Sequence, residues 1–335
     1  MSNERDTEAL VGLTSTEISN IWTAYLKNSM EQKFFEYFLS TTEDDDVAKV
    51  IKKFLIQLKK STNELKKLFD SENLVIPLGF TDEDTCLDAS RVFSDIFILY
   101  FCYDLTLLSM STYPSALSDS TRKDARNYFA MSLEFSIRIQ DEIVNLMLSK
   151  GVYKRPPHVA IENTVDFVEG KSYLSGILGE PRPFNVAEIA NLSRIIHRAQ
   201  FSKMVFVAFS KIATSNEAKG YFGKGRDEIQ KVLDLLQEAL EKENIPISGS
   251  GDYRIFDVER APFSDKLMLY FIITCLGLFC VTMLCQAMTS CLRSDIIVKL
   301  SKVMSDMMPY YRDGLKLAIK EGWLEKPPQT IDRRV

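Results

Sequence analysis

The chain of 335 residues lacks several patterns on which catalytic and metal-binding folds depend. It contains two histidines, His158 and His197, and none of its six cysteines forms a Cys-x-x-Cys pair. Neither a Gly-x-x-x-x-Gly-Lys-Ser/Thr loop nor a Gly-x-Gly-x-x-Gly loop is present, and no Ser or Cys stands in a recognisable nucleophile turn. No stretch alternates between apolar and polar residues for long enough to predict a strand. These absences argue against a nucleotide site, a thiolate metal site and a β-rich fold.

Positive charge is also scarce, because 41 Lys and Arg residues face 46 Asp and Glu residues, which gives a net charge of −5. Without a general basic field, nucleic acid is not an expected partner. The cysteines lie mostly in apolar stretches that are predicted to be helical, which is typical of small buried side chains in a reducing compartment. The N-terminal residues 1–10 are polar and lack the basic and apolar blocks of a signal peptide. We therefore expect a cytoplasmic protein, and nothing in the sequence predicts a cofactor.

The sequence contains an internal repeat. Several short matches recur in order at an offset of 171 residues, and a Phe-Ser-Asp motif at residues 93–95 recurs at 263–265, an offset of 170. The matched pairs are Glu17 and Glu188, Glu72 and Glu243, Arg122 and Arg293, Asp124 and Asp295, and Gly151 and Gly322. An ordered series at nearly constant offset indicates duplication of one unit. We expect the residue that is lost and later regained to lie in the loops.

Each copy predicts four helices. Apolar residues recur at three- and four-residue steps, Thr14 with Glu17 and Asn185 with Glu188 resemble capping boxes, and Gly151 and Gly322 suit left-handed helix stops. Four long helices with short connections predict an antiparallel bundle. The predicted fold class is therefore all-α, with two tandem four-helix bundles related by the repeat. The expected divisions are a first bundle at 1–151, a bridging segment packed on the bundles at 152–184, and a second bundle at 185–335.

One apolar run, residues 267–285, is long enough to cross a membrane. Its counterpart in the first repeat, residues 96–116, carries Asp104 and several Ser and Thr residues. Because both runs occupy the third-helix position, we expect a buried third helix or one at a subunit interface, and no membrane span.

Several motifs identify the chain with a known family. They include residues 13–22, the Phe-Ser-Asp motif that opens both third helices, the closures at 150–157 and 322–328, and the bridge text at 165–168 and 179–183. Over nearly the whole length, the sequence resembles the family called domain of unknown function 3231, found in spore-forming Bacillus-type bacteria. The resemblance implies tandem ferritin-like four-helix bundles, and some members are labelled "putative spore coat protein". The family has no established activity, so no functional residue is carried over.

A ferritin-like bundle raises the question of a di-iron site, which needs inward Glu residues and two Glu-x-x-His motifs. Neither histidine follows a Glu by three residues. A carboxylate-only site in the first bundle would have to use Glu36, Asp104 and Glu134, but Glu36 aligns with Val207 and Asp104 with Thr274. The sequence therefore predicts no catalytic, cofactor-binding or metal-binding residue, although it leaves a carboxylate-only site in the first bundle open.

Two further sequence patterns are interpreted first as structural features and not as catalytic or nucleotide-binding sites. The glycine-rich residues 220–225 fall inside a predicted helix and follow no strand, so we expect a helix irregularity there and not a phosphate loop. Methionines are concentrated in the second repeat, where they predict core packing or an adaptable apolar pocket. These methionines are Met268, Met283, Met288, Met304, Met307 and Met308.

The leading hypothesis is a non-catalytic helical interaction or structural protein, with a link to sporulation, an unknown protein partner and the option of self-association. The alternatives are a divergent ferritin-like metal-binding protein and a carrier of a small apolar ligand.

Overall fold

The computed structural model describes residues 11–161, 164–177, 180–247 and 253–333, and within them it is all-α, as predicted. The described residues contain no strand, only two isolated bridges. The chain packs into two compact units. Unit 1 consists of residues 1–151, 254–267 and 321–335, and unit 2 consists of residues 152–253 and 268–320.

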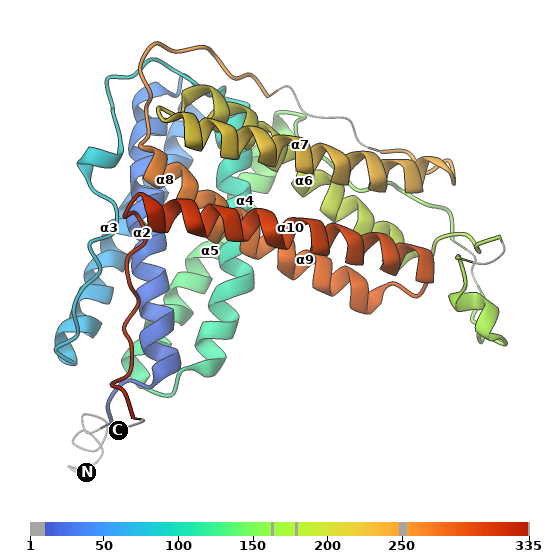
Figure 1. Cartoon of the computed structure of the whole chain (residues 1–335), viewed down its shortest axis with the longest axis horizontal. Coiled ribbons are helices and arrows are strands. Elements are labelled where there is room, and N and C mark those ends of the chain that lie inside the picture. Colours follow the sequence, from blue (N-terminus) through green and yellow to red (C-terminus); the bar gives the residue numbers. More distant parts are fainter. Residues whose placement is uncertain (1–10, 162–163, 178–179, 248–252, 334–335) are drawn as a thin grey trace. The chain divides into compact units, whose positions relative to one another are not determined.

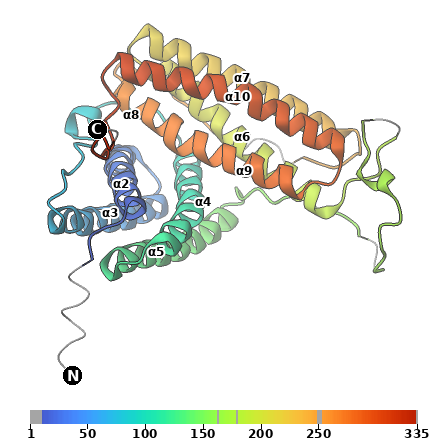
Figure 2. The same cartoon turned by 60° about the horizontal axis from the view of Figure 1, so that its bottom comes forward.

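The helices of the first repeat are α2 (Ser15–Thr41), α3 (Asp45–Ser71), α4 (Asp95–Asp119) and α5 (Lys123–Ser149). Those of the second are α6 (Val186–Ile212), α7 (Asn216–Glu241), the series α8 (Asp265–Tyr270), η4 (Phe271–Leu276) and α9 (Gly277–Ser290), and α10 (Ser294–Lys320). Short 3₁₀ turns, η2 (Asp82–Asp84) and η3 (Lys171–Leu174), lie in the connections. Both views show α7, α9 and α10 running side by side (Figures 1 and 2).

The predicted helix boundaries are confirmed where the sequence gave cap signals. Thr14 with Glu17 and Asn185 with Glu188 form complete capping boxes. Gly151 and Gly322 follow α5 and α10 with φ of +67° and +70°, the left-handed region that glycine enters without a steric penalty. Pro309 lies inside α10, which runs as one helix from Ser294 to Lys320.

In each unit, the acidic and basic residues that the repeats share form one network of hydrogen bonds and ion pairs between helix ends, which we call the helix clasp. Glu17 is fully buried and accepts hydrogen bonds from the backbone N–H groups of Thr121 and Arg122, both at 2.8 Å, while Arg122 also pairs with Glu72 and Asp124.

In unit 2, Glu188 accepts from the N–H groups of Leu292 and Arg293, both at 3.0 Å. Arg293 in turn pairs with Glu243 and Asp295. Most of the polar matches between the repeats therefore tie the start of the first helix to the start of the fourth, and their role is structural.

Unit 1 also contains a segment of the second repeat, residues 254–267. Phe263 packs edge-on against Phe34 and Tyr37, with ring centroids 4.6 and 5.0 Å apart. Two equivalent backbone hydrogen bonds join this segment to the first repeat: Ser94 N–H donates to the Arg254 carbonyl, and Ser264 N–H donates to the Asp84 carbonyl. Donor and acceptor positions correspond at the repeat offset of 170. The loops that open both third helices are therefore built into the same unit.

The third helical stretch differs between the repeats by one residue. At the start of the third helix, the two repeats are offset by 170 residues, from Asp95 to Asp265. At its end they are offset by 171 residues, from Asp119 in α4 to Ser290 in α9. The expectation that this residue is regained in a loop is wrong. It is absorbed inside the helix by the π-helical turn η4, because a π turn accommodates one extra residue per turn.

The bridging segment is less packed than two of its residues suggested. Val165 and Phe167, which we expected to pack on a bundle, have exposed fractions of 96% and 86%. The backbone around them is irregular, so no helix carries their side chains on a common face. Arg182 anchors the end of the segment through Glu188 at 2.8 Å and through the Tyr173 ring. Leu178, which we also expected to pack, lies outside the described residues.

Two helical stretches, Asp95–Asp119 and Asp265–Ser290, are long and apolar enough to cross a membrane by length and composition alone. Within the structure, 67% and 61% of their most apolar windows are buried, as buried core helices require. That neither crosses a membrane stays a prediction.

Replacing Phe263 by Ala should destabilise unit 1 by about 3–5 kcal/mol, because the substitution empties a fully enclosed aromatic site. Both tryptophans, Trp22 and Trp323, belong to unit 1, so a urea titration followed by tryptophan fluorescence measures this unit. Phe167→Ala, which removes an exposed ring, should leave the midpoint unchanged. Equal midpoints for wild type and Phe263→Ala would contradict this account of the segment.

Replacing Glu17 by Gln should remove a pH-dependent part of the stability. Burial alone would raise the pKa of Glu17, but hydrogen bonds from Arg122, Thr14 and Thr121 outweigh it and lower the pKa from 4.5 to about 2. A depressed folded-state pKa contributes stability above about pH 4.5 that is lost as the pH falls towards 2. The difference between wild type and variant should be roughly 2–3 kcal/mol at pH 6 and shrink steadily below pH 4.5.

Urea midpoints between pH 6 and pH 3 measure this difference. Glu134→Gln, at an exposed carboxylate, is the matched control and should show none. A wild-type advantage over Glu17→Gln that is constant with pH would refute the assignment.

Candidate functional site

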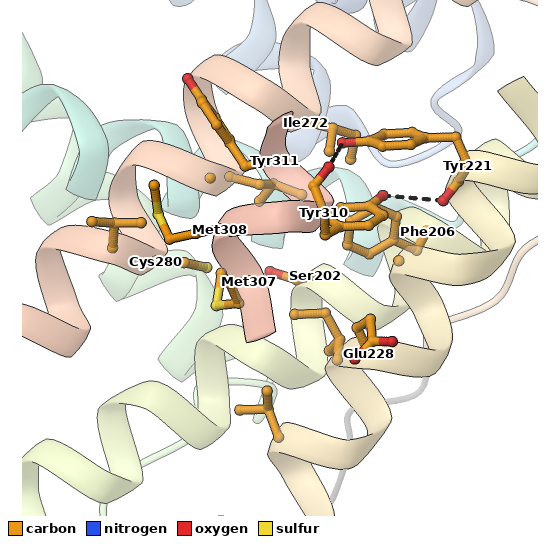
Figure 3. A pocket seen from close by; sticks show the side chains of 16 residues that line it. Ser202, Phe206, Tyr221, Glu228, Ile272, Cys280, Met307, Met308, Tyr310 and Tyr311 are labelled. Atoms are coloured by element: carbon orange, nitrogen blue, oxygen red, sulfur yellow. Dashed lines mark hydrogen bonds between the residues drawn. The ribbon is translucent and has the colours of Figure 1, made fainter. Parts of the chain in front are cut away.

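The most prominent apolar cavity lies inside unit 2, between α6, α7, α10 and the η4–α9 stretch. About 610 Å³ around it is not filled by atoms, but this figure includes open solvent, and the cavity volume itself is about 50 Å³. Its lining is almost entirely apolar and aromatic. The residues labelled in Figure 3 are Ser202, Phe206, Tyr221, Glu228, Ile272, Cys280, Met307, Met308, Tyr310 and Tyr311.

A pair of tyrosines closes one side of the cavity. The rings of Tyr221 on α7 and Tyr310 on α10 stack with centroids 4.4 Å apart and an interplanar angle of 9°. Each phenol hydroxyl donates to the backbone carbonyl of the other residue, at 3.1 Å from Tyr310 and 3.5 Å from Tyr221 (Figure 3). The reciprocal bonds satisfy both hydroxyls and join α7 to α10.

Two glycines, each four residues after a tyrosine of the pair, make room for it. A Cβ on Gly225 would lie 2.3 Å from the Tyr310 hydroxyl, and a Cβ on Gly314 would lie 2.3 Å from the Tyr221 hydroxyl. Both positions therefore exclude any larger side chain unless the tyrosines move. The glycine-rich residues 220–225 lie within the continuous helix α7, which confirms a helical segment in place of a phosphate loop. The expected irregularity is wrong, because the α-helix is unbroken there and the last glycine is a packing site.

The π turn forms the opposite wall. The N–H of Gly277 donates to the Ile272 carbonyl five residues earlier, and Ile272, Leu276 and Gly277 all line the cavity. Figure 3 shows Met307, Met308 and Cys280 on the side of the cavity away from the stacked tyrosines. Methionine and a π turn both adapt to irregular volume, so this wall can adjust to an occupant.

A second, smaller cavity of about 310 Å³ adjoins the first and shares Ile229, Val232, Cys280 and Met307 with it. Of the ten residues that line it, Arg198 alone carries a charge. The Arg198 side chain is 6% exposed, and its guanidinium lies 4.1 Å from the centroid of the Phe279 ring and 3.5 Å from the Cys275 carbonyl. Burial lowers the pKa of Arg198 to about 10, so the group is still charged at neutral pH.

Ser202 stands one helical turn after Arg198 and lines the main cavity. It is 1% exposed, and in the described part of the chain its hydroxyl has no hydrogen-bond partner. A buried polar group without a partner costs about 1–3 kcal/mol, which a bound polar atom would recover.

The equivalent register of unit 1 carries an ion pair. Lys27, at the register of Arg198, lies 2.7 Å from the Glu31 carboxylate and donates to the hydroxyls of Ser109 and Tyr113 at 3.0 and 3.4 Å. Burial raises the pKa of Glu31, although Lys27 opposes the effect. The repeat offset of 171 places Ser202 at the position of Glu31. Each unit thus buries a cation from its first helix, but with different surroundings.

The residues considered for metal binding do not gather into a site. Glu36 is half-buried and accepts from Gln32 and Lys33, whereas Glu134 is exposed on α5 beside Arg138, and Asp104 is buried in α4. Across the ranges that the structure describes, no group of three or more His, Cys, Asp or Glu residues could hold a metal ion.

The two histidines occupy separate places. His158 lies in the bridge, and His197 is half-buried in α6. Burial, with a contribution from Lys154, lowers the pKa of His197 to about 4, so its ring is neutral at pH 7.

The cluster of methionines in the second repeat was the sequence feature that indicated a pocket in this region. Met283, Met307 and Met308 line one cavity or the other, while Met268 is fully buried in the core. Arg198 and Ser202 were missed because no motif marks them. The repeat contained a usable signal. Arg198 aligns with Lys27, and four residues later Ser202 aligns with Glu31, so the second repeat keeps the cation and loses the carboxylate.

Fold and cavity together define an all-helical protein of two tandem bundles, one of which contains an apolar pocket. The chain belongs to the family described as "Protein of unknown function (DUF3231)", which matches residues 7–165 and again residues 172–335. The double match agrees with the internal repeat.

Among solved structures, one described as "a putative spore coat protein" from Bacillus halodurans C-125 is 18% identical to this chain, with a TM-score of 0.41. The similarity covers 45% of this chain and 98% of that chain. No curated protein matches the sequence significantly.

Replacing Gly225 by Ala should destabilise unit 2 by about 1–3 kcal/mol, because the new methyl group collides with the Tyr310 hydroxyl and the Phe206 ring. Gly220→Ala in the same helix meets nothing within 4 Å and should stabilise the protein by up to about 1 kcal/mol through helix propensity. Thermal unfolding followed by circular dichroism at 222 nm separates the two. Equal effects of the two alanines would show that the close approach at Gly225 is absent.

Proposed function

We propose that this chain is a non-catalytic helical binding protein whose second unit holds a small apolar molecule in its interior. The observation that carries the proposal is the almost wholly apolar lining of this partly open cavity, with the adaptable methionine side chains in its wall. Water gains little in such a space, whereas an apolar molecule gains about 25 cal/mol for each Å² of surface that it removes from water.

The walls of the cavity support binding of a ligand and not mere loose packing. The Tyr221–Tyr310 pair, with Gly225 and Gly314, holds α7 and α10 in fixed register on one side. Cys280, Val281 and Met307 on the other side are only partly buried, so a molecule could enter without unfolding the bundle. A rigid wall facing an adaptable, partly open one is the arrangement that a carrier requires.

The polar residues that the repeats share support the non-catalytic part of the proposal. The helix clasps hold Glu17 and Arg122 in unit 1 and their counterparts Glu188 and Arg293 in unit 2. Their hydrogen bonds and ion pairs join helices, and the proposal gives none of them the role of a general acid or base. Their duplication is therefore explained by structure.

The proposal extends to location. We place the protein in the cytoplasm of a spore-forming bacterium and link it to sporulation, with an unknown protein partner or self-association. The support is the family resemblance described for the sequence. Antibody staining of growing and sporulating cells would test it, and a signal that is confined to growing cells would contradict the link.

Binding of 1-decanol, a neutral apolar probe, tests the pocket directly. Isothermal titration of the delipidated protein should show one site, and Cys280→Phe should weaken binding at least tenfold, because Cys280 lines both cavities. Cys285→Phe, the same change at an exposed cysteine of α9, is the control and should bind as wild type does.

Native mass spectrometry of the protein as purified offers an independent readout, in which a co-purified apolar molecule supports the proposal. Equal binding of 1-decanol by Cys280→Phe and the wild type, or no binding by the wild type of either 1-decanol or the carboxylate of the same chain length, would overturn it.

A further inference from the structure

Two polar side chains from one face of α6, Arg198 and Ser202, line the connected cavities, whereas the carboxylate of Glu228 on α7, which also lines the main cavity, pairs with Lys231 at 2.9 Å. Arg198 and Ser202 are four residues apart, so their side chains project from the same side of the helix. Arg198 lines the smaller cavity and Ser202 the main one, and the two cavities share four lining residues. A guanidinium and a hydroxyl therefore lie one helical turn apart on the same face of α6, each in the lining of one of the two cavities.

Unit 1 shows what a cation at this register binds. Lys27 is 2.7 Å from the carboxylate of Glu31 and also donates to the Ser109 hydroxyl. In the second repeat the position of Glu31 holds Ser202, whose side chain is shorter and neutral. The exchange removes a carboxylate from this register and puts a buried hydroxyl in its place.

The hydroxyl of Ser202 supplies independent evidence. It is almost completely buried, and no described residue hydrogen-bonds to it. A ligand oxygen placed between the hydroxyl and the guanidinium would satisfy the first and pair with the second. A carboxylate matches these donors well, because its two oxygens accept charge-assisted hydrogen bonds from Arg and a further bond from a hydroxyl.

We infer that unit 2 binds an amphiphile with a carboxylate head, which Arg198 and Ser202 hold, and an apolar chain that extends into the main cavity. The inference rests on the proposed function and narrows it to a class of ligand. The bound carboxylate takes the place in unit 2 that the Glu31 carboxylate has in unit 1.

Titration calorimetry with two probes of equal chain length, decanoate and 1-decanol, separates the two levels of the argument. The wild type should bind decanoate at least tenfold more tightly than 1-decanol at pH 7.5. If neither probe binds, the proposed function fails. If both bind with equal affinity, the pocket stands and the carboxylate inference is overturned.

Variants of the two polar residues locate the head group. Arg198→Met keeps the length of the side chain without its charge and should abolish the preference for decanoate while decanol still binds. Arg198→Lys should restore part of the preference, and Ser202→Ala should weaken decanoate binding severalfold without loss of stability. Arg194→Met removes one positive charge from the exposed side of α6 and is the matched control.

The wild-type ratio of affinities stands even if Arg198→Met fails to fold, which circular dichroism would reveal. A folded Arg198→Met variant that keeps the tenfold preference for decanoate would overturn the assignment of the head-group site.

Discussion

A positive charge inside a helical bundle is the constraint around which both units are organised. Moving a cation from water into a dry interior costs several kcal/mol even after relaxation, so its surroundings must compensate it. Unit 1 compensates Lys27 internally with Glu31, Ser109 and Tyr113. Unit 2 keeps a cation at the same register but replaces the carboxylate by Ser202, and cavities lie beside the pair.

The single extra residue in the third helix of the second repeat accompanies this change. A one-residue insertion in an α-helix rotates all later side chains by about 100° unless a π turn absorbs it. Here η4 absorbs it, so Cys280 takes the register of Ser109, and Ile272, Leu276 and Gly277 become cavity wall. The Tyr221–Tyr310 pair then holds α7 and α10 in place on the far side. The two copies of the same plan thus differ at this register, with an ion pair in unit 1 and apolar cavities in unit 2.

Much of the architecture was predictable because it follows from local signals. The capping boxes at Thr14 and Asn185 and the left-handed glycines at 151 and 322 depend only on neighbouring residues, and the ordered repeat fixed the number of bundles. The methionine clustering indicated the right region for a pocket, although core packing explained it equally well. That the bundles share the ferritin-like plan stays a prediction.

The remaining features depend on side chains that are distant in sequence. Nothing near Arg198 indicates that its side chain turns inward, since α6 is apolar on more than one face. The Tyr221–Tyr310 stack joins residues 89 positions apart, and Phe263 belongs to unit 1 although its sequence belongs to the second repeat. Val165 and Phe167 show the converse, because apolar residues without a regular element to carry them stay exposed.

The account's central claim is that the apolar cavities of unit 2, and not the interior of unit 1, receive a ligand. Labelling the methionine methyl groups with ¹³C and recording their NMR spectrum during a decanoate titration tests it residue by residue. We predict that the signals of Met283 and Met307, which line the cavities, shift progressively, while those of Met30 and Met147, which are buried in unit 1, stay in place. Shifts confined to the methionines of unit 1, or no shift at all, would contradict the account.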